Sequence, residues 1–342
     1  QSAFKFNIPL SRDNGETEIL EAWRIIYCDA TGPTKGGVRF CPEINEENLS
    51  NIAFRIFLKA AANRLPHGGA CGGVKVNPHS LSPTEKEYVS RAYVNALGEQ
   101  IGQDRDILSP DLGTNAQVMS WMADQFNKRK GGNFPAAVNG KLPGKGGIEG
   151  REDATGIGAV HVLETILSDE KKSLVNMSFS IQGAGSAGGK LALFLYQRGS
   201  KVIAMCDSSG GWHQDSGLNV PAIMEKKENG LSFNKMELED ATKVPRDKIL
   251  EITSDCVVPA AIAEQINSGN VDKINCKYIL EIANSPIESG QDAVLEEKGI
   301  IIIPDIVANA GGIIVSHFEW AQNLQGLRWK KADVLNLLKE KT

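Results

Sequence analysis

A glycine-rich turn between a strand pattern and a helix pattern constrains the fold more than any other feature of the sequence. The stretch SIQGAGSAGGK places Gly183, Gly185 and Gly188 in the spacing GxGxxG, after an apolar strand pattern and at the start of a helix pattern. Glycines at this spacing allow a tight turn and let a pyrophosphate approach a helix N-terminus. We predict a dinucleotide-binding turn that includes Ser186 and Ala187. The alternative is a glycine-rich turn without a ligand.

The strand pattern that follows, KVIAMCD, ends at an acidic residue. Asp207 lies 24 residues after Gly183, close to the distance expected of the carboxylate that binds an adenosine ribose hydroxyl. Such an acid favours NAD as cofactor, because it would repel the 2'-phosphate of NADP. Lys201, Lys226 or another basic group would offset that repulsion, so NADP stays possible.

Short apolar runs continue through the second half of the chain, separated by helical patterns. Runs of this kind predict βαβ units and a parallel sheet buried on both faces, which is a doubly wound α/β fold. The stretches EIAN and IPDIVANAGG place Asn284 and Asn309 after two of these runs. Ligands bind at the carboxyl ends of parallel strands, so both asparagines are candidates, although a loop Asn is more often a turn former.

The first half of the chain has a different organisation. The stretch EILEAWRIIYC predicts a strand, and the following stretch of residues 45–65 has apolar residues at helical spacing, with Lys59 at the edge of the apolar stripe. Ser82, Pro83 and Glu85 form a capping-box pattern that begins a second helix.

A length of 342 residues favours two domains. The glycine-rich stretch LPGKGGIEGREDATGIG marks the expected boundary. We therefore predict an N-terminal α/β domain over 1–150, a Rossmann-type domain over 151–330, and the start of a C-terminal helix over 331–342.

Composition excludes several classes of function. A formal charge of −5 offers no field that would attract nucleic acid or anionic lipid, and the apolar runs are far shorter than the ~20 residues of a membrane span. No leader pattern is found, and no metal-ligand spacing such as HExxH occurs. The six cysteines form no CxxC pair, which indicates reduced thiols. We expect a cytoplasmic protein, with the mitochondrial matrix or another organelle as alternatives.

Several motifs together resemble the glutamate, leucine, phenylalanine and valine dehydrogenase family, and its glutamate dehydrogenase branch in particular. The motifs, in the family's order, are GPTKGGVRF, LPHGGACGGVKVNP, SPDLGTNAQVMSWM, GREDATGIG and NAGGIIVSHFEW. The resemblance implies that an N-terminal substrate domain, of the type that also makes dimer contacts, faces a Rossmann cofactor domain across a cleft. It also implies oxidative deamination of L-glutamate to 2-oxoglutarate and ammonia with NAD or NADP, and cofactor contact at Thr155.

The resemblance assigns roles to four side chains. Lys35 would bind the side-chain carboxylate of the substrate with help from Ser316, Lys59 would bind the α-carboxylate, and Asp111 would be the catalytic acid or base. Branches that oxidise apolar amino acids lack the lysine at position 35, because an apolar side chain would leave its ammonium unpaired. The alternatives are an edge lysine at 59, an ordinary turn residue at 35 and a turn-forming aspartate at 111.

One position departs from the family pattern. The family motif GGxKGG carries the catalytic lysine where this chain has Cys71, 12 residues after Lys59. We interpret the flanking glycines as a loop that brings this position close to the substrate. A thiol carries no positive charge, and if Lys35 and Lys59 lower its pKa it becomes a thiolate, which opposes the negative charge of the transition state. His67 is a local imidazole, more often a structural group than a base.

Two interpretations of this substitution stay open. The first is a glutamate dehydrogenase with severely reduced turnover. The second is a pseudoenzyme that binds glutamate or NAD as a regulatory subunit; a cysteine introduced by engineering is a further explanation. The resemblance implies a homo-oligomer, or a hetero-oligomer with an active paralogue, although family members carry additional helical segments at both ends.

Overall fold

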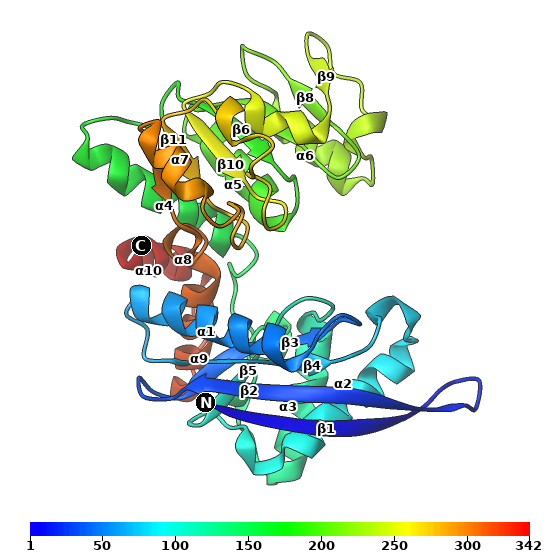
Figure 1. The fold of residues 1–342 in the computed structure, drawn as a ribbon. Helices are drawn as coiled ribbons and strands as arrows, with labels where there is room; N and C mark the ends of the chain where they lie inside the picture. Colours follow the sequence, from blue (N-terminus) through cyan, green and yellow to red (C-terminus); the bar gives the residue numbers. More distant parts are fainter. The chain divides into compact units, whose positions relative to one another are not determined.

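The computed structural model describes residues 1–342, which form two compact units (Figure 1). Unit 1 comprises residues 1–151, 313–337 and Lys341, and unit 2 comprises residues 152–312, 338–340 and Thr342. The sequence predicts the second domain over 151–330, so residues 313–330 are the main difference. They belong to unit 1 because α9, Gly311–Gln325, is bonded to it through its side chains, including a buried ion pair between Glu319 and Lys141 at 2.9 Å.

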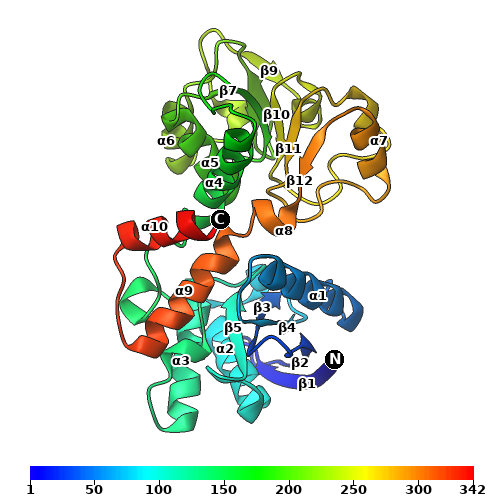
Figure 2. The same ribbon diagram turned by 90° about the vertical axis from the view of Figure 1, so that its left-hand side faces the viewer.

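Unit 1 is built on a five-stranded mixed sheet in the order β1-β2-β4-β3-β5. β1 pairs with β2 and β2 with β4 in antiparallel fashion, whereas β3 is parallel to both β4 and β5. The strands are β1 Ser2–Ser11, β2 Thr17–Cys28, β3 Thr34–Phe40, β4 Gly68–Val74 and β5 Asp106–Pro110. Helix α1, Glu46–Ala62, covers one face, and α2, Pro83–Leu97, and α3, Ala116–Lys130, cover the other (Figure 2).

Local sequence signals explain the helices of unit 1. The apolar stripe of α1 is confirmed, with Leu49, Ala53 and Ala60 buried. The capping box of α2 is also confirmed, because Ser82 accepts from the backbone of Glu85 and the Glu85 carboxylate accepts from the backbone of Ser82. These contacts satisfy backbone groups that a helix end leaves unpaired, and they determine where the helix begins.

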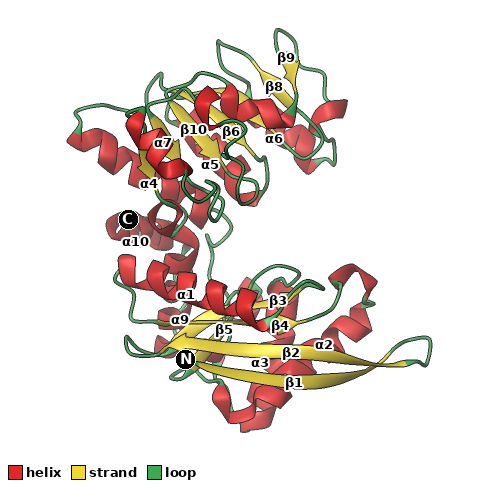
Figure 3. Cartoon of the chain, viewed as in Figure 1, coloured by secondary structure: helices red, strands yellow, loops and turns green.

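Unit 2 is built on a seven-stranded sheet in the order β12-β11-β10-β6-β7-β8-β9. Strands are drawn in yellow in Figure 3. The strands are β6 Ser178–Gln182, β7 Lys201–Cys206, β8 Gly211–His213, β9 Thr242–Val244, β10 Cys256–Pro259, β11 Tyr278–Leu280 and β12 Ile301–Ile303. Five strands are parallel, as predicted, but β8 and β9 are antiparallel additions. The chain order reverses between β6 and β10, which is the position where doubly wound sheets bind ligands.

Helices lie on both faces of this sheet. α4, Ala154–Asp169, and α5, Ser186–Gln197, cover one face, and α7, Gln291–Glu297, covers the other (Figure 2). The remaining helices are α6 Val220–Glu228, α8 Asp305–Ala308 and α10 Lys331–Lys341, the last of which confirms the predicted C-terminal helix. Short 3-10 helices are η1 Pro78–Ser80, η2 Gly98–Gln100, η3 Pro135–Ala137, η4 Pro143–Lys145, η5 Phe233–Lys235, η6 Arg246–Glu251 and η7 Val271–Lys273. None of the helices is both long enough and apolar enough to span a membrane.

Candidate active site

The four glycines around Cys71 lie in a buried strand, and the interpretation of this stretch as a loop is wrong. All seven residues of β4 are buried. A Cβ added at Gly69 would lie 2.4 Å from the Ala53 carbonyl oxygen of α1, and one at Gly72 would lie 2.3 Å from the Tyr93 hydroxyl of α2. The glycines therefore make room for the chain's own helices on the two faces of the sheet.

Cys71 faces α1 and is fully buried. Its side chain packs in an apolar cluster with Trp23 and Ile25 of β2 and with Leu49 and Ala53 of α1. Burial, together with the nearby Asp111 carboxylate, raises the pKa of the Cys71 thiol to about 12. The conditional expectation of a thiolate is thus wrong, because the apolar surroundings outweigh the nearby cations. Cys71 is a neutral thiol at physiological pH.

Asp111 lies just after β5 and close to Cys71. A Cβ at Gly37 would come within 2.6 Å of Asp111 Oδ2, so the absence of a side chain at Gly37 makes space for the carboxylate. Arg39 Nε donates to Asp111 Oδ2 at 2.9 Å, and the Leu112 backbone N–H donates to Oδ1 at 2.7 Å. The Asp111 carboxylate also contributes to the raised pKa of the Cys71 thiol, so these two predicted residues lie in the same part of unit 1. Arg39 is a partner that the sequence reasoning missed.

Lys35 and Ser316 are 281 positions apart and are in direct contact. Lys35 Nζ donates to Ser316 Oγ at 2.5 Å and to Ser109 Oγ at 3.2 Å. The side chain is only 3% exposed, and no carboxylate lies within 4.0 Å of its ammonium. Burial, followed by the repulsion of Arg151, lowers the pKa of Lys35 to about 7. Lys35 is thus a buried amine in direct contact with no carboxylate, and its charged form is destabilised.

The surroundings of Lys35 include further polar groups that the sequence did not single out. Asn139 is fully buried, and its Nδ2 donates to the Ser316 carbonyl at 2.5 Å, whereas its Oδ1 has no hydrogen-bond partner. His67 Nε2 lies 3.0 Å from His317 Nδ1, and burial lowers the pKa of His67 to about 3. His67 is thus an uncharged, packed imidazole. Ser109 could have been found from sequence, since it precedes the SPDLG aspartate by two residues.

Lys59 is half-buried in the last turn of α1. Its backbone carbonyl accepts from the amide of Asn63, which ends the helix. Since β4 packs against α1, Lys59 belongs to the helix that covers the Cys71 side of the sheet.

In unit 2, the glycine turn has the geometry of a phosphate-binding turn. Gly183 has a φ of +113°, which favours glycine, and a Cβ at Gly188 would lie 2.0 Å from the Gly183 carbonyl oxygen. Gly185 is the N-cap of α5 without a side-chain cap, and nothing lies within 4 Å of its Cβ position. The amide groups at Ser186 and Ala187 open the helix, where an anion is favoured. These residues fit the pyrophosphate of a dinucleotide.

Asp207 directly follows β7, as predicted, but its carboxylate is occupied by the chain itself. Oδ1 accepts from the backbone and hydroxyl of Ser209 at 2.8 and 2.6 Å, and Oδ2 accepts from Lys227 Nζ at 2.9 Å. Burial opposes ionisation here, yet the bonds from Ser209 and Lys227 lower the pKa of Asp207. Lys201 and Lys226 are the basic groups expected from the sequence, whereas Lys227 is the one that pairs with Asp207 in the fold.

The structure also brings the two candidate asparagines together. Asn309 Nδ2 donates to Asn284 Oδ1 at 3.2 Å and to the Ile282 carbonyl at 3.1 Å. Both follow the carboxyl ends of neighbouring parallel strands, β11 and β12. Thr155 is half-buried in the first turn of α4, in the same unit.

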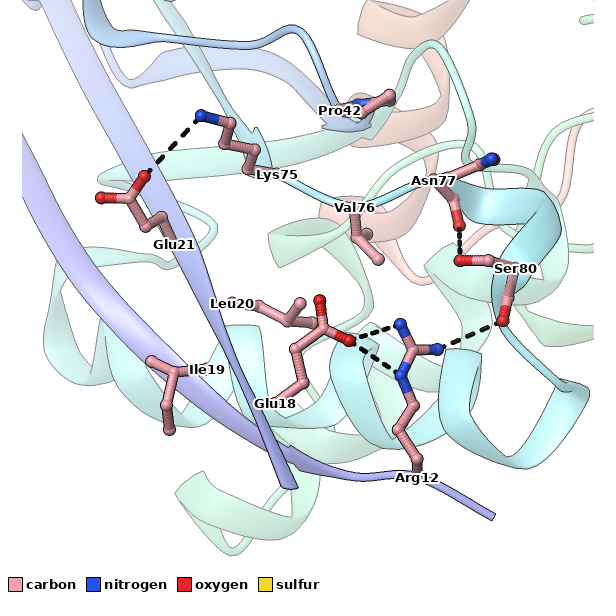
Figure 4. Close-up of a pocket in the computed structure, with 10 residues that line it drawn as sticks. All are labelled: Arg12, Glu18, Ile19, Leu20, Glu21, Pro42, Lys75, Val76, Asn77 and Ser80. Carbon is pink, nitrogen blue, oxygen red and sulfur yellow. Dashed lines mark hydrogen bonds and ion pairs between the residues drawn. The ribbon is translucent and has the colours of Figure 1, made fainter. Parts of the chain in front are cut away.

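A hollow of about 470 Å³ lies beside the β1–β2 hairpin, near the turn that joins the two strands (Figure 4). Its charged groups are already paired, since Arg12 Nε donates to Glu18 at 2.8 Å and Lys75 lies 4.0 Å from Glu21. None of the predicted site residues lines it.

The fold and the glycine turn define a two-domain α/β protein with a Rossmann-like nucleotide-binding domain. Residues 146–342 match the Glutamate/Leucine/Phenylalanine/Valine dehydrogenase family, and residues 1–128 match the Glu/Leu/Phe/Val dehydrogenase dimerisation domain. The chain therefore belongs to the glutamate, leucine, phenylalanine and valine dehydrogenase family.

Named relatives are glutamate dehydrogenases. The chain is 38% identical to the NADP-specific glutamate dehydrogenase of Synechocystis sp., covering 100% of this chain and 81% of the relative. It is 37% identical to the catabolic NAD-specific glutamate dehydrogenase RocG of Bacillus subtilis, covering 99% and 79%. Among solved structures, the hetero-hexameric glutamate dehydrogenase of Thermus thermophilus in its Leu-bound form has a TM-score of 0.92 at 32% identity, covering 100% of this chain and 80% of that one.

Proposed function

We propose that this chain binds L-glutamate and 2-oxoglutarate together with NAD or NADP, as a glutamate dehydrogenase-type oxidoreductase. The observation that carries the proposal is the surroundings of Lys35: a buried amine whose direct partners are two hydroxyl groups. A buried cation without an anion is costly, and a ligand carboxylate would relieve that cost. The side-chain carboxylate of glutamate supplies such a group, and an apolar side chain does not.

The remaining roles are proposed from the family resemblance. Ser316 supports Lys35, Lys59 binds the α-carboxylate, and Asp111 exchanges protons with the amino group and with water. The cofactor turn comprises Gly183 to Gly188, with Asn284, Asn309 and Thr155 as further contacts. NAD or NADP, when bound, accepts the hydride from the substrate carbon.

We expect turnover to be severely reduced because position 71 holds a neutral thiol. A lysine at this position would stabilise negative charge on the reacting oxygen and transfer protons. Loss of one such donor costs about 3 to 4 kcal/mol of transition-state stabilisation, and loss of a positioned proton carrier lowers the rate by about 10² to 10⁴. The two effects overlap. Buried among apolar side chains, the Cys71 thiol supplies neither function.

The second candidate is a pseudoenzyme that binds glutamate or the dinucleotide and regulates a partner. The uncharged Cys71 favours it, and the hetero-hexameric relative from Thermus thermophilus motivates an assembly with an active paralogue. The two candidates differ in turnover and agree in ligand binding.

The experiment is an assay of NADH and NADPH oxidation with 2-oxoglutarate and ammonia, for the unaltered chain and for Cys71→Lys. We expect a low or absent rate that rises in Cys71→Lys. Cys71→Ala is the matched control, and it should leave the low rate unchanged because the thiol performs no chemistry. A substantial rate in the unaltered chain that is lost in Asp111→Ala and not raised by lysine would contradict the expected impairment.

Binding should be separable from turnover. Lys35→Leu should weaken glutamate binding, measured by calorimetry on the full chain, even if no reaction occurs. An unchanged glutamate affinity in this variant would remove Lys35 from the site.

A further inference from the structure

A small pocket of about 140 Å³ lies in unit 2 near the carboxyl ends of β6, β7 and β10. It is lined by Gln182, Gly183, Cys206, Asp207, Ser208, Arg246, Ala261, Ile262 and Gln265. The strand order reverses between β6 and β10, so the pocket lies at the switch point of the sheet. Gln182 is 5% exposed, and its Oε1 has no hydrogen-bond partner. This buried acceptor is available to a donor group of a ligand that enters the pocket.

The acidic residue of this pocket is neutralised. Besides Ser209 and Lys227, the backbone N–H of Phe233 donates to Asp207 Oδ2 at 3.4 Å. These contacts join the turn after β7 to α6 and η5, and they leave the side chain 11% exposed. A carboxylate so engaged is a poor acceptor for ribose hydroxyls, because each new bond would displace an existing one. Its negative charge is also balanced by the Lys227 ammonium.

The basic residue of the pocket is unpaired. Arg246 begins η6 and is exposed, and its guanidinium has no hydrogen bond or ion pair within the chain. With Asp207 and Lys227 cancelling each other, Arg246 leaves a net positive charge at the pocket. A guanidinium with free donors is suited to a phosphate, which it binds through paired hydrogen bonds.

We infer that this pocket selects a dinucleotide with a phosphate on its adenosine ribose, with Arg246 as the cation that binds the phosphate and Lys227 as the partner that neutralises Asp207. The inference rests on the proposed function and narrows it, because it names NADP rather than NAD as the preferred cofactor. It reverses the expectation drawn from Asp207 alone. The acid that follows β7 is present, but in the folded chain its charge is balanced by Lys227.

The test compares two probes that differ only in the 2'-phosphate, adenosine 5'-monophosphate and adenosine 2',5'-bisphosphate. Binding to the full chain is measured by titration calorimetry, which needs no turnover. We expect the bisphosphate to bind at least about tenfold more tightly, the effect of one charge-assisted contact. Arg246→Ala should remove most of this advantage and leave the affinity for the monophosphate unchanged.

A matched variant distinguishes a direct contact between Arg246 and the phosphate from a general attraction by positive charge. Lys248 lies on the same 3-10 helix, is exposed and does not line the pocket. Lys248→Ala removes one positive charge, as Arg246→Ala does, and should keep the preference for the bisphosphate. Lys227→Met should also reduce the preference, because it leaves Asp207 as an unpaired anion at the pocket.

Three outcomes would overturn the inference in distinguishable ways. If the monophosphate binds as tightly as the bisphosphate, the 2'-phosphate selection is wrong and the proposed function stands. If Arg246→Ala and Lys248→Ala reduce the preference equally, Arg246 is not the contact. If neither probe binds at millimolar concentration, the dinucleotide site itself is wrong, and the proposed function fails with it. The melting temperature of each variant confirms that it is folded.

Discussion

The glycines of residues 68–73 and those of residues 183–188 are alike in sequence and differ in their surroundings. In β4 the Cβ positions of Gly69 and Gly72 are filled by backbone and side-chain atoms of neighbouring elements. In the turn before α5, nothing lies within 4 Å of the Cβ position of Gly185, which is exposed. The first segment is closed by the protein's own packing, whereas the second is open at Gly185, at a helix N-terminus, although Gly183 and Gly188 also lie against neighbouring backbone.

The comparison shows that a glycine cluster can serve either of two physical needs. Close approach of backbone and side chains within a fold requires glycine for the same steric reason as close approach of a ligand. Only the neighbours distinguish the two. We therefore expect substitution of Gly69 or Gly72 to change stability, and substitution of Gly185 to change binding.

The largest expected effect is at the buried pair beside the first segment. Arg24 is fully buried, lies against the Cβ position of Gly72, and its Nη2 donates to Asp106 at 2.6 Å. Arg24→Met leaves a buried carboxylate without its cation, which should lower the free energy of unfolding by about 3 to 5 kcal/mol. Urea denaturation measures this. Arg91→Met, which breaks partly exposed ion pairs, is the control and should cost less than about 1 kcal/mol; equal losses would contradict the argument.

A smaller effect is expected at Gly72 itself. Gly72→Ala places a methyl group 2.3 Å from the Tyr93 hydroxyl and 2.5 Å from the Trp23 carbonyl oxygen. This overpacking should lower the free energy of unfolding by about 2 to 3 kcal/mol, again measured in urea. Gly144→Ala, with no atom within 4 Å of the new methyl group, is the matched control. If both variants unfold at the same urea concentration, β4 is not closed by packing.

Lys35 gives an effect that depends on pH. The pKa of Lys35 is about 7 in the folded chain, and its ordinary value of 10.5 applies to the unfolded chain. Between these pH values the folded chain therefore binds fewer protons than the unfolded chain. The free energy of unfolding should therefore rise with pH across this window, by at most about 1.4 kcal/mol per pH unit from this group. The difference between the unaltered chain and Lys35→Met isolates the contribution. If the free energy of unfolding depends on pH in the same way in both proteins, burial does not destabilise the charged form of Lys35.

The smallest effect on stability is expected in the open segment. Gly185 has a φ of −79° and no close neighbour, so Gly185→Ala should cost only the N-cap preference for glycine, less than about 1 kcal/mol of the free energy of unfolding. The same methyl group should weaken the binding of ADP, since the pyrophosphate must approach this backbone. A loss of stability as large as that of Gly72→Ala would remove the distinction between the two segments.

Much of the local structure could be predicted from the sequence. The strand before the turn, the helix after it and the capping box at Ser82 depend on residues a few positions apart, and periodicity and cap chemistry identify them. The pairing of Lys35 with Ser316 follows from family resemblance, because nothing local relates residues 281 positions apart. Arg39, Lys227 and Arg246 were missed since each acts on a site through a contact that only the folded chain creates.

By itself, the sequence determined the alternation of strands and helices, the position of the glycine turn before α5 and the family to which the chain belongs. These features depend on local spacing and on motifs read in order. The tertiary structure decided the charge states: a neutral thiol at Cys71, a depressed pKa at Lys35 and an Asp207 that is already paired. Protonation and pairing depend on burial and on neighbours brought from distant parts of the chain, and that information exists only once the chain is folded.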